Sequence, residues 1–442
     1  MPDRDFEVGR LKRGLRPFAM FGVLFFLAAG GPYGLEEIVP TAGPGLAVLV
    51  LLAMGFFWAV PYALIVAELV SAIPEQGGGY RWYRAYLGPF WSFQFACLDW
   101  VSWALDAALY PPLVAAYLLR FLAPDASHFV SWLVGLVVIW GCTWINVRGV
   151  DLVGRLTSVL TVVVLASIGA FVVLGWSSIS LDTLSPMVPD GKSFHEALNF
   201  ALVFCVWSYS GYGGLAYASE EVVHPERNYP RVLAVLVPLT ILIYVLPLLV
   251  TLGATPDWET WQTAQFDVAA LVVGGAGLAV LMSVGAQLAN IGLFSSELMV
   301  TSRLPYAMAK DGLLPEVFTQ LHPRYGTPSR FLVLQAILYS VLTWFLDFTQ
   351  ILLVSTWISL PSYMLMFVTP MILRVRRPDL RGPFRIRGGW PVLALCAGVP
   401  NAVCVYVLVT MGVEEMLMGL VFLVIPPALY LWSRYSIGNP AK

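Results

Sequence analysis

The sequence predicts an all-α membrane protein with twelve transmembrane helices. Of its 442 residues, 59% are hydrophobic and only 12% are charged, whereas an average soluble protein has about 25% charged residues. Apolar runs long enough to cross a bilayer, about 20 residues each, recur along the whole chain. These observations exclude a soluble enzyme, and the near balance of 25 basic and 27 acidic residues excludes a nucleic-acid-binding face.

Twelve apolar runs separated by short polar connections carry this prediction. They cover residues 17–40, 45–71, 89–119, 129–147, 152–176, 196–222, 232–253, 268–300, 331–346, 351–373, 392–411 and 416–432. Connections of this length are too short for an independent soluble domain. The cysteines lie inside apolar runs without metal-ligand spacing, so we expect core packing, no metal and no cofactor.

The distribution of Lys and Arg predicts the orientation of the chain. Positive residues concentrate in the cytoplasmic loops of membrane proteins. With both termini in the cytoplasm, all of the 25 Lys and Arg residues except Arg120 and Lys192 fall on the cytoplasmic side. We therefore expect a multi-pass protein of the cell membrane with two cytoplasmic termini.

Two runs contain glycine-rich clusters that interrupt a helix, at residues 30–34 and 208–214. Pro32 in the first cluster donates no backbone hydrogen bond, and unpaired peptide groups in a bilayer are costly unless they face a cavity or a ligand. Each cluster alone also fits close helix packing. Two breaks at corresponding positions of two halves, however, are typical of an inverted-repeat secondary transporter.

Pairing the broken helices as helices 1 and 6 gives a core of five plus five helices and two extra C-terminal helices. The predicted organisation is a cytoplasmic tail (1–16), a first repeat with helices 1–5 (17–176), a second repeat with helices 6–10 (196–373), a basic cytoplasmic loop (374–390), helices 11 and 12 (391–433) and a cytoplasmic tail (434–442).

Several strings resemble a known superfamily. They lie at residues 67–69, 74–80, 87–89, 146–149, 220–230 and 302–315. In these strings the chain resembles the amino acid, polyamine and organocation transporter superfamily. Residues 30–36 and 106–111 resemble its polyamine uptake branch, which usually has Asn where this chain has Ala107. The resemblance implies twelve helices, proton-coupled uptake, and a substrate site between broken helices 1 and 6 with helices 3, 8 and 10 around it.

The chemistry of the first break favours an amine as substrate. In an amino acid transporter of this fold, the substrate carboxylate is expected at the N–H groups that begin the outer half of helix 1. Here Pro32 removes a donor and Glu36 places a carboxylate at the same helix start. A polyamine-like cation is therefore expected, and an amino acid permease or exchanger for cationic or neutral L-amino acids is the alternative.

Asp106 lies near the middle of run 89–119, where a carboxylate is costly and by default functional. Asp99 lies two helical turns earlier, with Trp103 between the two acids, so the three side chains form a row that could bind a linear cation along its length. For Asp99 itself, a structural role is favoured. Alkylammonium groups bind aromatic faces; packing or gating is the alternative for the aromatic candidates. The predicted substrate-binding residues are Gly30, Gly31, Tyr33, Gly34, Glu36, Trp103, Asp106, Trp207, Tyr209 and Tyr212.

Coupling and gating are assigned to the remaining acids. Glu36, Glu37 and Asp106 are the candidates to carry a coupling proton; Ser295 and Ser296 would be sodium ligands in the alternative. Glu68, Glu220, Glu221 and Glu297 are candidate gate residues that would pair with Arg81, Arg303 or Arg227 near cytoplasmic helix ends, or form plain structural salt bridges. The expected mechanism is alternating access; a channel or sensor and, less favoured, a membrane-embedded enzyme are the rivals.

Overall fold

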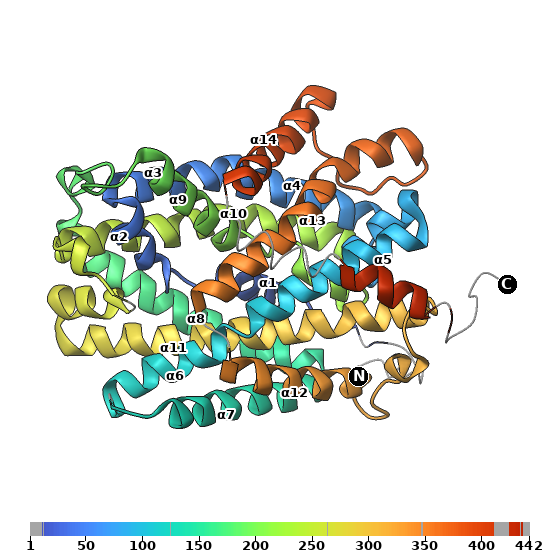
Figure 1. The fold of residues 1–442 in the computed structure, drawn as a ribbon, viewed down its shortest axis with the longest axis horizontal. Coiled ribbons are helices and arrows are strands. Elements are labelled where there is room, and N and C mark those ends of the chain that lie inside the picture. The colour runs from blue at the N-terminus through green and yellow to red at the C-terminus, as the bar shows by residue number, and fades with distance from the viewer. Residues whose placement is uncertain are drawn as a thin grey trace.

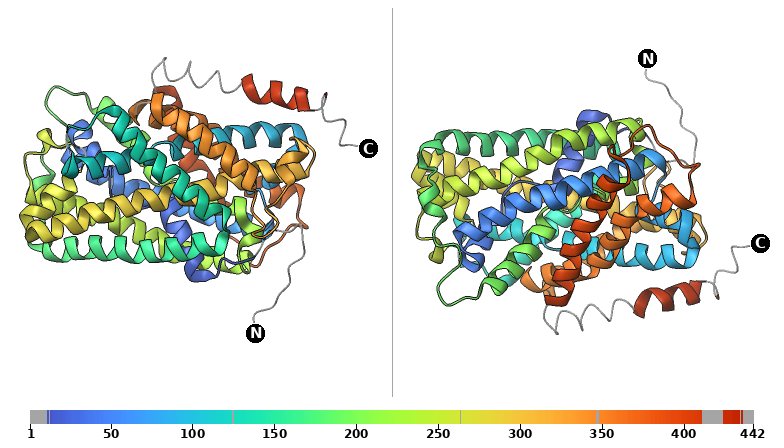
Figure 2. Two further views of the ribbon diagram at one scale, coloured as in Figure 1. Left: turned by 90° about the horizontal axis from the view of Figure 1, so that it is seen from below. Right: turned by 90° about the horizontal axis from the view of Figure 1, so that it is seen from above.

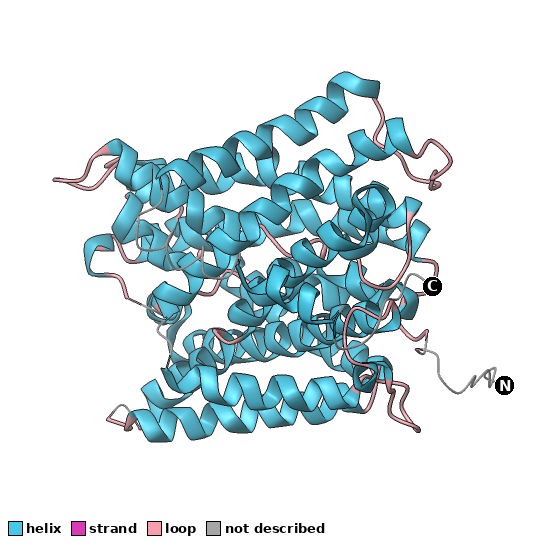
Figure 3. Cartoon of the chain, turned by 45° about the vertical axis from the view of Figure 1, so that its right-hand side comes forward, coloured by secondary structure: helices cyan, strands magenta, loops and turns pink. Residues whose placement is uncertain are grey.

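The computed structural model describes residues 11, 13–123, 125–262, 264–345, 348–410, 424–433 and 435. Every regular element in this part of the chain is a helix (Figure 3). The prediction of an all-α protein is therefore confirmed.

Fourteen labelled α-helices lie between residues 17 and 410 in the described part of the chain. They are α1 (Pro17–Ala28), α2 (Ile38–Ala42), α3 (Pro44–Met54), α4 (Val60–Ala72), α5 (Gly79–Ala107), α6 (Tyr110–Leu122), α7 (His128–Val147), α8 (Val150–Leu174), α9 (Phe194–Ser208), α10 (Pro225–Ala254), α11 (Gln265–Lys310), α12 (Ser329–Phe345), α13 (Phe348–Arg376) and α14 (Gly389–Thr410). Two short 3-10 helices matter below, η1 (Leu35–Glu37) and η5 (Gly214–Glu221).

Eight helical segments of the described chain are long and apolar enough to cross a membrane, and α1, α9 and α12 are shorter apolar helices. Most of the predicted last span, 416–432, lies outside the described residues, so the count of twelve stays a prediction. The described residues 424–433 are helical and lie on the outside of the bundle in both views of Figure 2.

The helices form one bundle with α1 near its centre (Figure 1). All residues from Gly22 to Ala28 are buried, because α1 packs against α8, α10 and α11. Helices α7 and α12 lie side by side along one edge, and α14 crosses the opposite edge against α13 and α4. Such a central apolar helix has no polar face and can end inside the bundle only where its freed backbone groups find partners.

Both predicted interruptions are present and touch each other. Helix α1 ends at Ala28, and Gly30, Gly31 and Gly34 adopt positive φ before the chain continues as η1. Helix α9 ends at Ser208, and the chain continues as η5 rather than as the α-helix predicted to reach residue 222. A Cβ atom at Gly211 would lie 1.8 Å from the carbonyl oxygen of Leu27, so the two breaks can meet only through a glycine.

The predicted third span differs from the structure at both ends. The helix begins at Gly79 and bends at Gly88, which has φ +80°, so Pro89 marks the bend rather than the start. The chain then breaks after Ala107 and continues as α6, whose first turn contains Pro111. Proline supplies no N–H to the preceding helical turn. This second break places Asp106 in the last turn of α5 and Tyr110 in the first turn of α6.

Candidate functional site

A cavity lies between the two helix breaks. The first break contributes the backbone of Gly31 and Gly34, the second contributes Ser210 and Gly211, and α5, α6, α9, α10, α11 and α13 supply the remaining walls. Side chains that line it include Tyr33, Glu37, Ser102, Trp103, Asp106, Tyr110, Trp207, Ser208, Tyr244, Asn290, Ser355, Thr356, Ser359 and Tyr363.

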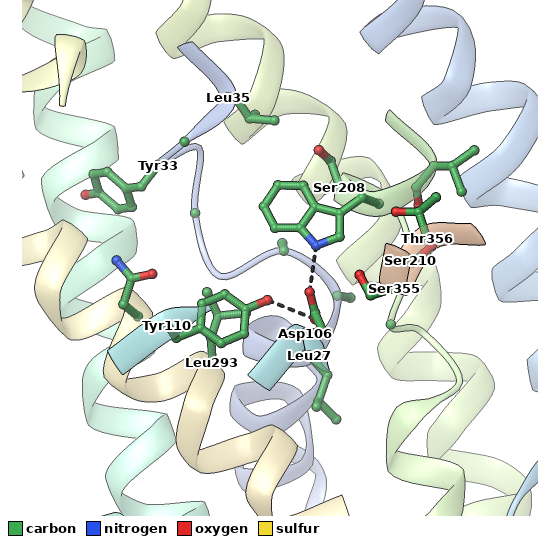
Figure 4. Close-up of a pocket in the computed structure, with 18 of the residues that line it drawn as sticks. Leu27, Tyr33, Leu35, Asp106, Tyr110, Ser208, Ser210, Leu293, Ser355 and Thr356 are labelled. Carbon is green, nitrogen blue, oxygen red and sulfur yellow. Dashed lines mark hydrogen bonds between the residues drawn. The ribbon is translucent and has the colours of Figure 1, made fainter. Parts of the chain in front are cut away.

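Asp106 is held in this cavity by two neutral donors. Trp207 donates from Nε1 to Oδ1 at 2.7 Å, and the Tyr110 hydroxyl donates to Oδ2 at 3.0 Å; dashed lines in Figure 4 mark both bonds. Tyr110 reaches Asp106 because residues four apart share one face of the helical path. Neither donor carries a positive charge, so the position is suited to a carboxylate that pairs with a cationic ligand.

The lining of the cavity has an acidic balance. Asp106 and Glu37 are its acidic residues, and no Lys, Arg or His of the described chain is among the residues that line it. Interactions between charges are strong where water is scarce. The cavity therefore favours cations over anions.

Freed backbone carbonyls and hydroxyl groups complete the polar surface. The Tyr244 hydroxyl lies 3.2 Å from the Ala29 carbonyl and 2.9 Å from the Ser208 carbonyl, so one side chain serves both breaks. On α13, the buried Thr356 hydroxyl has no hydrogen-bond partner among the described residues. Carbonyl and hydroxyl oxygens are acceptors for an ammonium N–H.

Trp103 separates the cavity from Asp99. Its ring lies against Gly214, where a Cβ atom would be 2.6 Å from the indole, and it meets Tyr217 edge to face with centroids 6.3 Å apart. Asp99 is outside the cavity lining and accepts a hydrogen bond from the Tyr217 hydroxyl at 3.1 Å. The predicted row of Asp99, Trp103 and Asp106 is thus divided by the indole.

Of the ten predicted substrate-binding residues, six line the cavity: Gly31, Tyr33, Gly34, Trp103, Asp106 and Trp207. Glu37, predicted for coupling, lines it too. Gly30, Glu36, Tyr209 and Tyr212 do not line it.

Glu36 turns away from the cavity toward the backbone. Its carboxylate accepts from the Gly34 N–H and from the Ala264 N–H, both at 2.8 Å, and the residue is fully buried. A carboxylate at a helix start is stabilised by such N–H groups. The expectation that Glu36 contacts the substrate therefore differs from the geometry, in which Glu36 joins η1 to the start of α11.

Gly30 packs against Leu293, and the two tyrosines pack against other aromatic rings. The Tyr209 ring packs at a tilt against Tyr244 with centroids 5.1 Å apart, and Tyr212 meets Tyr62 edge to face at 5.6 Å. Trp207 points into the cavity, and a residue two positions later in a helix projects from nearly the opposite face. Proximity in sequence to the break therefore did not determine whether a side chain points into the cavity.

The candidate gate residues have three different environments. Glu221 forms a bidentate ion pair, at 2.7 and 3.1 Å, with Arg303, which is one of the predicted partners. Glu68 instead pairs with Arg374, at 2.8 and 2.7 Å, and Glu220 exchanges hydrogen bonds with Gln76.

Glu297 does not lie among these ion pairs, contrary to the expectation that it pairs with an arginine near a helix end. Its carboxyl group lies beside the carboxyl group of Asp106 and the hydroxyl of Tyr110, within reach of a hydrogen bond to each. Glu297 precedes Arg303 by six residues in α11. This offset along the helix places Glu297 toward the cavity and away from the end that bears the arginines.

Tyr110, Tyr244 and the hydroxyl groups of α13 were missed in the sequence. Tyr110 carried a signal, its spacing of four from Asp106. Ser355, Ser359 and Tyr363 also recur at intervals of four in an apolar helix, a polar stripe that is expensive in lipid and marks an inward face. Tyr244 has no comparable signal, because only its contact with both breaks distinguishes it.

Known proteins similar to this chain identify its family. The sequence model of the amino acid permease family matches residues 21–430. The polyamine transporter PUT1 of Oryza sativa subsp. japonica is 32% identical, over 100% of this chain and 84% of its own length. The methylthioribose transporter of Bacillus subtilis is 26% identical, over 89% and 87%.

The crystal structure of MhsT in complex with L-phenylalanine shares the fold, with a TM-score of 0.64 over 97% of this chain and 100% of that one, at 13% identity. The chain therefore belongs to the amino acid permease family and is a membrane transporter rather than an enzyme.

Proposed function

We propose that this protein is a secondary active transporter that takes up polyamine-like organic cations, such as putrescine or spermidine, by alternating access with coupled protons. The single observation that carries the proposal is Asp106, a carboxylate without a cationic partner among the described residues, in a cavity whose described lining has no basic residue. The relatives named as polyamine transporters support the same substrate class.

Each part of the cavity has a role in this proposal. Asp106 binds one ammonium group, and the faces of Trp103 and Trp207 lie beside it. The carbonyls and hydroxyls at the breaks accept its remaining N–H bonds. Glu37, on the other side of the first break, is a second carboxylate for a second amine.

The first break also explains why an amine is preferred to an amino acid. A substrate carboxylate would need peptide N–H groups at the start of η1. The Gly34 N–H is already bonded to Glu36 at 2.8 Å, and residue 32 is proline. A bound carboxylate would therefore meet a fixed negative charge and fewer donors.

We place the arginine-rich end, defined by Arg81, Arg84, Arg303, Arg374 and Arg377, in the cytoplasm of the cell, together with both termini. The ion pairs of Glu68 and Glu221 at this end would have to separate for the substrate to leave, which makes them the candidate inner gate. Protons are the proposed coupling ions, with Asp106, Glu37 and Glu36 as the carboxyls to test.

Uptake of labelled putrescine into proteoliposomes tests the proposal. We expect the wild-type protein to accumulate putrescine when a proton gradient drives uptake. We expect Asp106→Asn to bind putrescine at least roughly 30-fold more weakly, because the variant lacks the negative charge that binds the ammonium group. The matched control is Glu316→Gln, an exposed acid outside the cavity, which should behave like the wild type.

Two results would contradict the assignment. Equal uptake by Asp106→Asn and wild type would remove Asp106 from the site. Strong competition by arginine or leucine, with no competition by spermidine, would favour an amino acid permease of the same fold; other relatives include a large neutral amino acids transporter.

A further inference from the structure

Glu297 is a buried carboxyl group that the proposed substrate site does not use. It is 1% exposed on α11, and one of its oxygens, Oε2, has no hydrogen-bond partner among the described residues. Its carboxyl group contacts the carboxyl group of Asp106 and the Tyr110 hydroxyl. The Tyr110 hydroxyl in turn donates to Asp106 at 3.0 Å. Two acids and one phenol from three helices thus meet at the cavity wall.

A direct hydrogen bond between two carboxyl groups requires a proton, because two carboxylates present only acceptors to each other. Without that proton, two like charges would lie in contact inside the bilayer. Among the described residues, neither acid forms an ion pair with Lys, Arg or His. The nearest arginine along α11, Arg303, is already bound to Glu221.

The other groups that face this pair are neutral. Tyr110 reaches both carboxyl groups from α6, Tyr339 on α12 lies within electrostatic range of both, and Tyr363 on α13 lies within electrostatic range of Asp106. The Trp207 indole donates to Asp106 from α9. On the α7 side, the Cys142 thiol points to the Ile291 carbonyl instead. The described surroundings therefore supply no cation to neutralise a second negative charge, and a proton is the remaining means.

We propose that Glu297 holds the coupling proton of this transporter, hydrogen-bonded to Asp106, while Asp106 binds the ammonium group of the substrate. The inference rests on the proposed function. A single carboxyl group would bind either a proton or a cation, which gives exchange of one for the other. Two adjoining carboxyl groups hold both at once, which uptake of substrate together with a proton requires. Glu297 takes the proton from water on one side of the membrane, which forms an O–H bond, and returns it to water on the other side, where that bond breaks.

The variant Glu297→Gln separates this role from a structural one. The glutamine amide still donates a hydrogen bond to Asp106 but releases no proton, so it resembles the protonated acid. We expect it to retain exchange of labelled for unlabelled putrescine across the proteoliposome membrane. We expect it to lose accumulation driven by a proton gradient, and to lose the internal acidification that accompanies putrescine entry in the wild type.

Three outcomes are decisive for this variant. Accumulation and acidification equal to the wild type would overturn the proposal while leaving the polyamine function intact. Loss of exchange as well, in a protein that elutes as a folded monodisperse peak, would also overturn it, because Glu297 would then serve binding or structure. Failure of the wild type itself to transport putrescine would be a failure of the proposed function.

A second measurement uses the wild-type protein in case the variant does not fold. Dicyclohexylcarbodiimide reacts with protonated carboxyl groups in apolar sites, and mass spectrometry locates the adduct. We expect an adduct on Glu297 that forms faster at roughly pH 6 than at roughly pH 8, although an ordinary glutamate is ionised at both. Labelling of other acids but not of Glu297 would overturn the proposal, whatever the substrate proves to be.

Discussion

The cavity and the arginine-rich end of the bundle use charge in opposite ways. In the cavity, Asp106 is bonded only to neutral groups or to another acid. At the arginine-rich end, Glu221 and Glu68 are each paired with an arginine, and Asp311 accepts from Arg81, Arg84 and Tyr80. Acids without a fixed cation mark the region that we propose receives one, and paired acids mark the region that holds helices together.

The paired acids join elements that are distant in the sequence. Glu221 in η5 is bonded to Arg303 in α11, and both side chains are at most 1% exposed. Glu68 in α4 is bonded to Arg374 at the end of α13. The first pair ties the segment after the second helix break to α11, and the second ties α4 to the end of α13.

The largest expected effect comes from breaking the buried pair at one partner. Arg303→Met would leave Glu221 charged and uncompensated inside the protein, and we expect a loss of about 3 to 5 kcal/mol in the free energy of unfolding. Thermal unfolding of the purified protein measures this.

The double variant Arg303→Met with Glu221→Leu is the control. Replacing both charges by apolar groups is often neutral or stabilising, so we expect the double variant to recover much of the loss. If the double variant is as unstable as the single one, the pair is not what holds this end together.

Local sequence features predicted the positions of the breaks, because glycine and proline act on the backbone within a few residues. The clusters at 30–34 and 208–214 interrupt α1 and α9 in the structure. The division of the chain into apolar helices followed from composition in the same way. The Gly88 bend also carried a local signal, a Gly-Pro dipeptide, but it was read as a helix start.

Side-chain directions could not be predicted in this way, because they depend on helices that are distant in the sequence. Glu36 bonds the N–H of Ala264, and Glu297 meets Asp106, which lies on α5. Tyr209 and Trp207 flank the same break, yet only Trp207 reaches the cavity. For these acids and aromatic residues the sequence predicted that they lie near the helix breaks, but it did not determine which groups their side chains contact.

A variant of Glu36 tests whether every acid near the cavity binds the substrate as proposed for Asp106. Because its oxygens are bonded to two peptide N–H groups, we expect Glu36→Gln to lose about 1 to 3 kcal/mol of stability, the range for hydrogen bonds to a charged group. We expect the putrescine dissociation constant to stay within a few-fold of the wild type. Calorimetric titration and thermal unfolding of one preparation give both numbers.

A contrary result would change the role of Glu36 from a structural acid to a substrate-binding acid. If Glu36→Gln binds putrescine as weakly as Asp106→Asn while its stability is unchanged, then Glu36 acts as a binding charge in another conformation, as the sequence predicted.

The smallest expected effect lies at the boundary between the two regions, at Trp103. The indole packs on Gly214 and Tyr217 and faces the cavity from that side. Trp103→Ala should weaken putrescine binding by about 0.5 to 2 kcal/mol, the contribution of a cation lying over an aromatic face, and Trp103→Phe should recover part of it. Tyr209→Phe is the control, because that hydroxyl has no hydrogen-bond partner among the described residues and the ring lies outside the cavity lining. If all three variants bind equally well, Trp103 only separates Asp99 from the cavity, and the substrate is recognised by the carboxyl groups and backbone carbonyls alone.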